Sequence, residues 1–136
     1  MYAGREEMLE RFSEAELFQL TDLDGLTGAI VESKLAAAVQ DAVNLIHGYL
    51  ADRYSLPLNP VPALAVRWTC DLARWFLQPH SAPEMVKANY ERTLAELKAT
   101  AAGEIKLDAP EKASGLFSGT AEIIAPPREF SGLKGF

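Results

Sequence analysis

The sequence is poor in cysteine and histidine. It contains one cysteine, Cys70, and two histidines, His47 and His80. A lone cysteine excludes a disulfide within the chain and a cysteine-based zinc site in one chain. Neither histidine has a glutamate or second histidine beside it at metal-ligand spacing. We therefore predict no metal and no other cofactor, and we expect Cys70 to be a buried, inert thiol.

Long apolar runs are absent as well. The longest aliphatic run, residues 35–39, is far shorter than the ~20 residues that cross a bilayer. Residues 1–7 are charged and lack the apolar segment of a signal peptide. We expect a soluble protein that is retained in the cytosol of the cell that makes it and has no membrane partner.

Positive charge is also scarce. Lys and Arg number 13 against 19 Asp and Glu, which gives a net charge of -6. Proteins that hold nucleic acid by neutralising phosphates concentrate Lys and Arg on one face. The chain can lie beside DNA, but we do not expect it to grip DNA.

The common catalytic and ligand-binding motifs are missing too. There is no nucleophile elbow, phosphate-binding glycine loop or dinucleotide fingerprint. The acidic stretch around Asp22 and Gly25 has the composition of a calcium loop, but the alignment puts Leu20 and Val31 where the first and twelfth ligands belong. We predict a turn with Asx chemistry there, and no enzymatic activity.

The sequence is rich in helical periodicity. Its 136 residues, 49% hydrophobic, suit one compact domain. Apolar spacing of three and four, capping patterns at Ser13 with Glu16 and at Ser81 with Glu84, and Gly103 as a C-cap predict an all-α bundle of two short and three longer helices. The predicted helices are residues 5–12, the segment after Ser13, residues 30–51, residues 62–77 with Pro62 first, and the segment from Pro83 to 101.

Helical periodicity stops after Gly103. Residues 104–107 alternate as a short strand does, and the rest is rich in Gly, Ser and Pro with spaced apolar residues. We predict a helical domain over residues 1–103 and an extended C-terminal arm over residues 104–136 that docks on a partner or a neighbouring copy.

The segment 62–77 is apolar on most of its surface, so we expect it to be covered on several sides, by its own core or by a neighbouring subunit. Its polar residues Arg67, Asp71 and Arg74 form one narrow stripe. The stripe is either a solvated helix face or a contact between subunits that sets their register.

Residues 49–58, which read Tyr-Leu-Ala-Asp-Arg-Tyr-Ser-Leu-Pro-Leu, resemble a family of short proteins from Mu-like phages and prophages. Residues 2–7, 20–22, 70–74 and 130–136 resemble the same family in the same order, so the likeness covers nearly the whole chain. The resemblance implies a morphogenesis protein of the phage neck, similar in helical build to adaptors that form a dodecameric ring beneath the portal.

The resemblance thus implies a structural head-to-tail connector, an adaptor ring in the virion neck that is present in the host cytoplasm during assembly, and the apolar helix and the arm fit that expectation. Its predicted partners are further copies of itself, the portal protein, a stopper or tail-completion protein, and the passing genomic DNA without sequence-specific binding. The arm would dock through Arg128, Phe130, Leu133 and Phe136. The core and the turn between helices would be built by Tyr49, Arg53, Tyr54, Pro57, Trp68, Trp75 and Phe76. Of these, Trp68, Trp75 and Phe76 would pack either the core or a seam between subunits.

Other functions compete with this prediction. The chain could instead be a stopper or tail-completion protein, or a monomeric regulatory or interaction module of the lytic cycle. An enzyme is the weaker alternative, because it needs a concave pocket with convergent titratable groups.

Overall fold

The structure, a computed structural model, describes residues 2–23 and 25–112. These residues form an all-α fold of two short and three longer helices, which confirms the predicted fold class. In the described part the only β pairing is an isolated bridge between Tyr54 and Glu111. The helices are α1 (Arg5–Arg11), α2 (Glu14–Thr21), α3 (Glu32–Leu50), α4 (Ala63–Leu77) and α5 (Glu84–Ala101).

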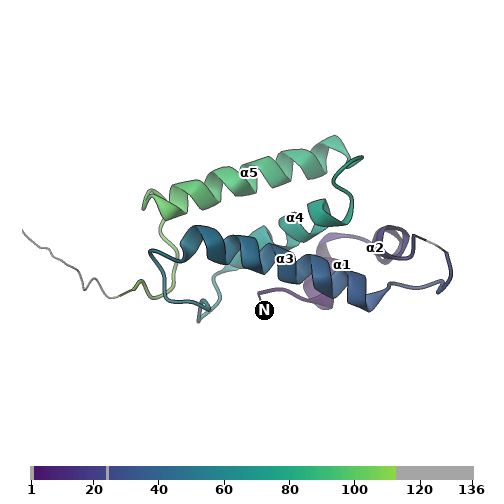
Figure 1. Cartoon of the computed structure of the whole chain (residues 1–136), viewed down its shortest axis with the longest axis horizontal. Coiled ribbons are helices and arrows are strands. Elements are labelled where there is room, and N and C mark those ends of the chain that lie inside the picture. The colour runs from purple at the N-terminus through teal and green to yellow at the C-terminus, as the bar shows by residue number, and fades with distance from the viewer. Residues whose placement is uncertain (1, 24, 113–136) are drawn as a thin grey trace, which may run out of the picture.

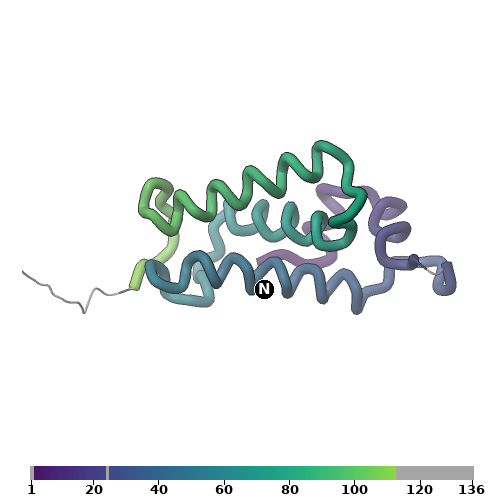
Figure 2. Tube along the Cα trace, turned by 45° about the horizontal axis from the view of Figure 1, so that its top comes forward, coloured from purple at the N-terminus to yellow at the C-terminus, as the bar shows by residue number. Residues whose placement is uncertain are grey.

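The three longer helices form an elongated bundle with α4 between α3 and α5 (Figures 1 and 2). The short helices α1 and α2 lie at the end of the bundle where α3 begins, and α1 packs on α4. The described chain ends at the opposite end of the bundle from α2 (Figure 1).

The apolar surface of α4 is covered mostly by its own chain. Trp68, Cys70, Leu72 and Ala73 have no exposed surface, because α1, α3 and α5 surround them. The high apolar content of residues 62–77 is thus explained largely by the central position of α4, and half-buried apolar residues remain at its first turn and its last turn.

The first capping pattern is half confirmed. The Ser13 hydroxyl accepts a hydrogen bond from the Glu16 backbone N–H at 3.1 Å, as an N-cap does. The Glu16 carboxylate does not accept the second capping-box bond from the Ser13 backbone N–H, because it accepts a bond from Arg74 of α4.

The second capping pattern is wrong. The N-cap of α5 is Pro83, with no side-chain cap bond, and Ser81 instead accepts a bond from the Gln78 side chain at 3.3 Å. Pro62 is likewise the N-cap of α4 and not its first residue. Gly103 does end α5, at a positive φ of 84°, directly after the C-cap residue.

Residues 104–107 do not form the predicted strand; they pack on the helical body. Leu107 is buried and its backbone N–H donates to the Tyr54 hydroxyl at 2.9 Å. The backbone of residues 110–112 then pairs with that of Arg53 and Ser55. Residues 104–112 are therefore attached to the helices, while the division into a domain and an arm at Gly103 stays a prediction.

Candidate functional site

The turn after α3 is held by Arg53 and Tyr54. Tyr54 is fully buried, and its hydroxyl accepts the bond from Leu107. Arg53 donates through Nε to the carbonyl of Ala101 at 3.3 Å, and its guanidinium lies against Gly103. The structure thus places both residues where the end of α3 meets the end of α5. Of the other predicted turn residues, Tyr49 is half-buried, and Pro57 is exposed and follows a cis peptide bond.

A contact missed by sequence reasoning joins this turn to the N-terminus. The Tyr2 hydroxyl accepts from the Leu58 backbone N–H at 2.8 Å and lies 2.6 Å from Nε2 of His47. Burial raises the pKa of Tyr2, and burial also lowers the pKa of His47. No local pattern predicts this contact, because its partners are 45 and 56 residues from Tyr2.

Arg67 and Asp71 of the polar stripe face α5. Arg67 pairs with Glu96 of α5 and lies 4.0 Å from the Asp71 carboxylate, which Arg92 of α5 approaches to 3.6 Å. Burial raises the pKa of Asp71, against the opposing effect of Arg67 and Arg92. These side chains link α4 to α5 within one chain.

Glu96, the acceptor at the centre of this cluster, was not predicted. Its carboxylate accepts from Arg67 and from the indole N–H of buried Trp68, the latter at 2.9 Å. Burial by itself raises the pKa of Glu96, but the bonds from Trp68 and Arg67 lower it by more, so the net shift is downward. A buried tryptophan N–H needs a hydrogen-bond acceptor. Trp68 in an apolar helix therefore indicated that an acceptor lies nearby, although not that it is Glu96.

Arg74 is only 3% exposed. It donates through Nε to Glu16 of α2 at 2.6 Å and through Nη2 to Gln78 at 3.2 Å. The solvated-face interpretation of the stripe is therefore wrong for Asp71 and Arg74, because α2 and α5 cover them. Contact of Arg67, Asp71 or Arg74 with a second subunit stays a prediction.

The acidic loop before α3 is the predicted turn. The Asp22 carboxylate accepts bonds from the backbone N–H groups of Leu26, Thr27 and Gly28. Each of these donors lies four to six residues after Asp22, so one side chain folds the loop back on the end of α2. The Asx chemistry is confirmed.

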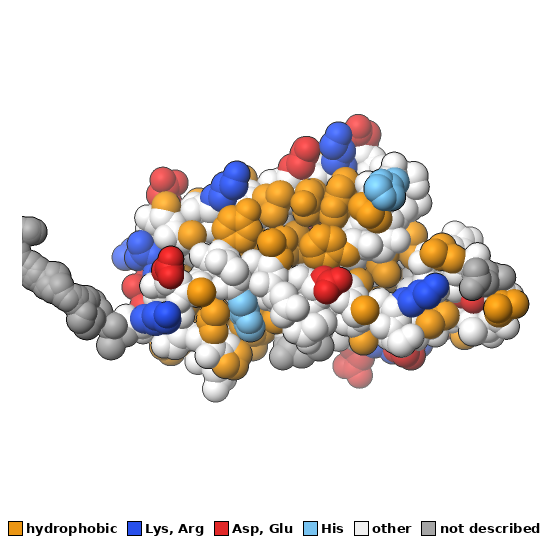
Figure 3. All heavy atoms as spheres, viewed as in Figure 1, with side chains coloured by type: hydrophobic (Ala, Val, Ile, Leu, Met, Phe, Trp, Pro, Cys, Tyr) orange, Lys and Arg blue, Asp and Glu red, His pale blue; other side chains and the backbone are white. Residues whose placement is uncertain are grey.

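One apolar face is incompletely covered. Trp75 of α4 stacks on Tyr90 of α5 with ring centroids 4.4 Å apart, and both are half-buried, as are Val86 and Leu94 on α5. We call these four residues the α4–α5 apolar face. Figure 3 shows apolar side chains gathered along the side of α5 that borders α3 and α4. Phe76 is half-buried and packs against the core, and Trp68 lies within the core.

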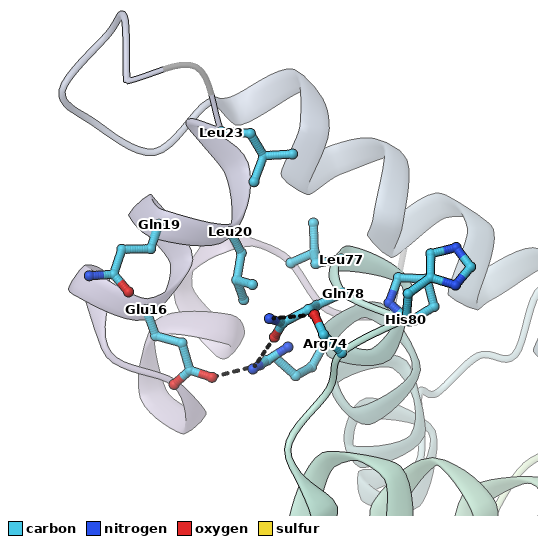
Figure 4. Close-up of a pocket in the computed structure, with 10 residues that line it drawn as sticks. Glu16, Gln19, Leu20, Leu23, Arg74, Leu77, Gln78 and His80 are labelled. Carbon is cyan, nitrogen blue, oxygen red and sulfur yellow. Dashed lines mark hydrogen bonds and ion pairs between the residues drawn. The ribbon is translucent and has the colours of Figure 1, made fainter.

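A groove lies at the α2 end of the molecule, with a volume of about 440 Å³ (Figure 4). Leu20, Leu23 and Leu77 supply its apolar wall. Arg74 and its partners Glu16 and Gln78 also line it, from α2 and from the end of α4. We call it the α2–α4 groove. Sequence reasoning did not predict it.

The predicted arm residues Arg128, Phe130, Leu133 and Phe136 lie outside the described residues. Their docking role stays a prediction.

Comparison with known proteins decides the family. The family model described as Bacteriophage Mu, Gp36 matches residues 2–122. This chain belongs to the Bacteriophage Mu Gp36 family. The Mu-like prophage FluMu protein gp36 of Haemophilus influenzae is 36% identical over 107 residues, which cover 79% of this chain and 75% of that protein. Gene product J of Escherichia phage Mu is 32% identical over 97 residues, which cover 71% and 69% of the two chains.

Membership of the Gp36 family confirms the resemblance to proteins of Mu-like phages and prophages. Within the part of the chain that the structure describes, none of the helices is long and apolar enough to cross a membrane.

Proposed function

We propose that this member of the Gp36 family is a structural head-to-tail connector, an adaptor that assembles into a ring in the phage neck below the portal. The observation that carries the proposal is the α4–α5 apolar face, which the described part of the chain leaves half-covered. Uncovered apolar surface of this kind is typical of contacts between proteins. A ring needs one surface of each copy to meet a different surface of the next.

The proposal assigns no catalytic step to the chain. The polar side chains singled out by sequence reasoning pair across helices: Arg67 and Asp71 with α5, and Arg74 with α2. Such pairs orient helices, as a scaffold requires. We propose the portal, a stopper or tail-completion protein and further copies of the chain as its partners, in the virion and, during assembly, in the host cytoplasm.

The net charge of -6 suits a passage for DNA. A ring lumen that attracted phosphates would retain the genome as it passed, whereas an acidic surface does not bind it. Genomic DNA is therefore a partner that passes without sequence-specific contacts.

Two measurements test the proposal together. Native mass spectrometry of the full chain should show an oligomer of defined size, and electron microscopy of virions should place the chain as a ring next to the portal. A ring that forms only on the portal also supports the proposal. A species of 14.9 kDa at every concentration, with no density for the chain in virions, would contradict it and favour a monomeric regulatory module. Density for the chain at a position in the neck further from the portal would favour the stopper role.

A further inference from the structure

The α2–α4 groove combines an apolar wall with one buried cation. Leu23, on the rim, is 70% exposed, and Leu20 and Leu77 continue the apolar surface inward. At the floor lies Arg74, between Glu16 and Gln78 (Figure 4). Gln19, His80 and Ser81 also line the groove, so polar side chains make up much of its surface. A binding site usually combines apolar walls with placed polar groups.

One nitrogen of the Arg74 guanidinium has no partner in the described part of the chain. Nε and Nη2 of Arg74 bond to Glu16 and Gln78, but Nη1 is buried and has no hydrogen-bond partner among the described residues. An unsatisfied buried donor is costly. Nη1 has no accessible surface in this arrangement, so the Arg74 side chain has to shift towards the groove before the acceptor of an occupant can satisfy it.

The charge around Arg74 restricts the kind of acceptor. Glu16, 2.6 Å from Nε, already neutralises the guanidinium, and its side chain is 37% exposed at the groove. A phosphate or a carboxylate would be repelled by Glu16, whereas a backbone carbonyl would not. The groove is therefore built for an uncharged or basic peptide segment with apolar side chains.

Residues 130–136 of the chain have this composition. They read Phe-Ser-Gly-Leu-Lys-Gly-Phe, with an apolar residue at every third position and no acidic residue. Lys134 is complementary to Glu16, and the two glycines let the backbone approach the floor closely.

Geometry favours the segment of a second copy over the chain's own. The described chain ends at the far end of the bundle from the groove (Figure 1). Its own C-terminal residues would have to run back along the whole molecule, whereas a copy placed head to tail brings its groove towards that end. Residues 113–136 span at most roughly 80 Å when fully extended, and the route to a second copy uses less of that length.

We infer that the α2–α4 groove binds residues 130–136 of a second copy of the chain, with a leucine or phenylalanine against Leu23 and Leu77 and a backbone carbonyl on Arg74. This inference rests on the proposed self-association and names a contact that supports it. It assigns the arm to the adjacent subunit.

Cross-linking between two full-length chains tests the contact. One variant carries Phe136→Cys and the other Leu23→Cys, and they are mixed under a mild thiol oxidant. Cys70 does not compete, because it is buried and burial raises its pKa to about 11. The matched control replaces Leu23→Cys with Ala37→Cys, an exposed position on α3. We expect at least about fivefold more covalent dimer with Leu23→Cys, because binding raises the effective thiol concentration.

A pair of charge substitutions gives an independent measurement. Leu23→Asp should weaken self-association of the full chain about tenfold, because it adds a charge at the apolar rim. Leu26→Asp, in the same loop but outside the groove and 83% exposed, should leave it unchanged. Both positions are exposed, so both variants should fold.

The outcomes separate this inference from the proposed function. Oligomers that persist with equal cross-linking at positions 23 and 37 overturn the groove contact and leave the adaptor proposal standing. A Leu23→Cys/Phe136→Cys double variant that closes only within one chain overturns the second-copy assignment. If the chain forms no oligomers and is not found in virions, the proposed function itself is wrong.

Discussion

Single side chains organise the loops of this protein, and Asp22 is the clearest example. Its carboxylate collects three backbone N–H donors from Leu26, Thr27 and Gly28. Burial by itself raises the pKa of Asp22, but these bonds lower it by more, so the folded-state pKa lies below the ordinary value of 3.8. A carboxyl with a lowered folded-state pKa stabilises the fold above its unfolded pKa, and that contribution is lost as the pH falls through the folded value.

We therefore predict that Asp22→Asn lowers the unfolding temperature at neutral pH and reduces the loss of stability on acidification below about pH 4. Thermal unfolding followed by circular dichroism between pH 2 and pH 7 measures both effects. Asp41→Asn, at an exposed position on α3, is the control and should leave the pH profile unchanged. An unchanged profile for Asp22→Asn would show that the loop bonds do not depend on the charge.

Gly103 supports a second residue-scale prediction. A Cβ at this position would lie 2.9 Å from Nη2 of Arg53, and its φ of 84° disfavours other residues. Gly103→Ala should therefore lower the free energy of unfolding by about 1–2 kcal/mol, measured by urea denaturation.

Gly48 is the matched control for this substitution, because it lies inside α3 and a Cβ there meets nothing within 4 Å. Gly48→Ala should raise the stability by roughly 0.5–1 kcal/mol. Equal effects of the same sign at the two glycines would contradict the assigned roles.

Between elements, polar pairs orient the helices around α4. Glu96 is the only described acceptor for the indole N–H of Trp68, and it also pairs with Arg67. Glu96→Ala should cost about 1–3 kcal/mol of unfolding free energy, because it leaves the buried indole N–H unsatisfied. Glu91→Ala, on the exposed side of α5, should stay within about 0.5 kcal/mol of the parent. Chemical denaturation of both variants tests the difference.

The segment after α5 also belongs to the stability of the helical body. Truncation after Gly103 removes the buried side chain of Leu107 and the N–H partner of the Tyr54 hydroxyl. We expect a loss on the order of 2–4 kcal/mol, since removing a buried leucine costs about this much. Truncation after Lys112 keeps both contacts and should unfold at the temperature of the full chain when both are measured at a concentration where the full chain is monomeric. Calorimetry of the two fragments decides whether residues 104–112 stabilise the body.

At the scale of the whole molecule, self-association should depend on the α4–α5 apolar face. Leu94 is half-buried on this face, whereas its neighbour Ala95 is exposed on another side of α5. Leu94→Lys should weaken association at least about tenfold, because a charge in an apolar contact must be desolvated. Ala95→Lys adds the same charge elsewhere and should associate as the parent does. Sedimentation velocity over a range of concentrations measures the self-association of both variants. Equal association of the two would show that the interface does not include this face.

The helical fold followed from local rules in the sequence. Apolar spacing located α3, α4 and α5, Ser13 marked the start of α2, Asp22 marked the turn before α3, and Gly103 marked the end of α5. These features depend on residues within a few positions of each other, which a sequence displays directly. The Tyr-Leu-Ala-Asp-Arg-Tyr stretch at residues 49–54 was the most specific of the segments that indicated the family.

Only the tertiary structure decided which polar groups meet and which apolar surface is left uncovered. The Ser81 capping pattern failed because Ser81 bonds to Gln78, and Arg74 is buried because α2 folds over it. The contacts of Tyr2 and Glu96 and the groove beside Arg74 each join segments far apart in the chain. Such contacts depend on how whole helices pack, and periodicity within one helix shows which face is apolar but not what covers it.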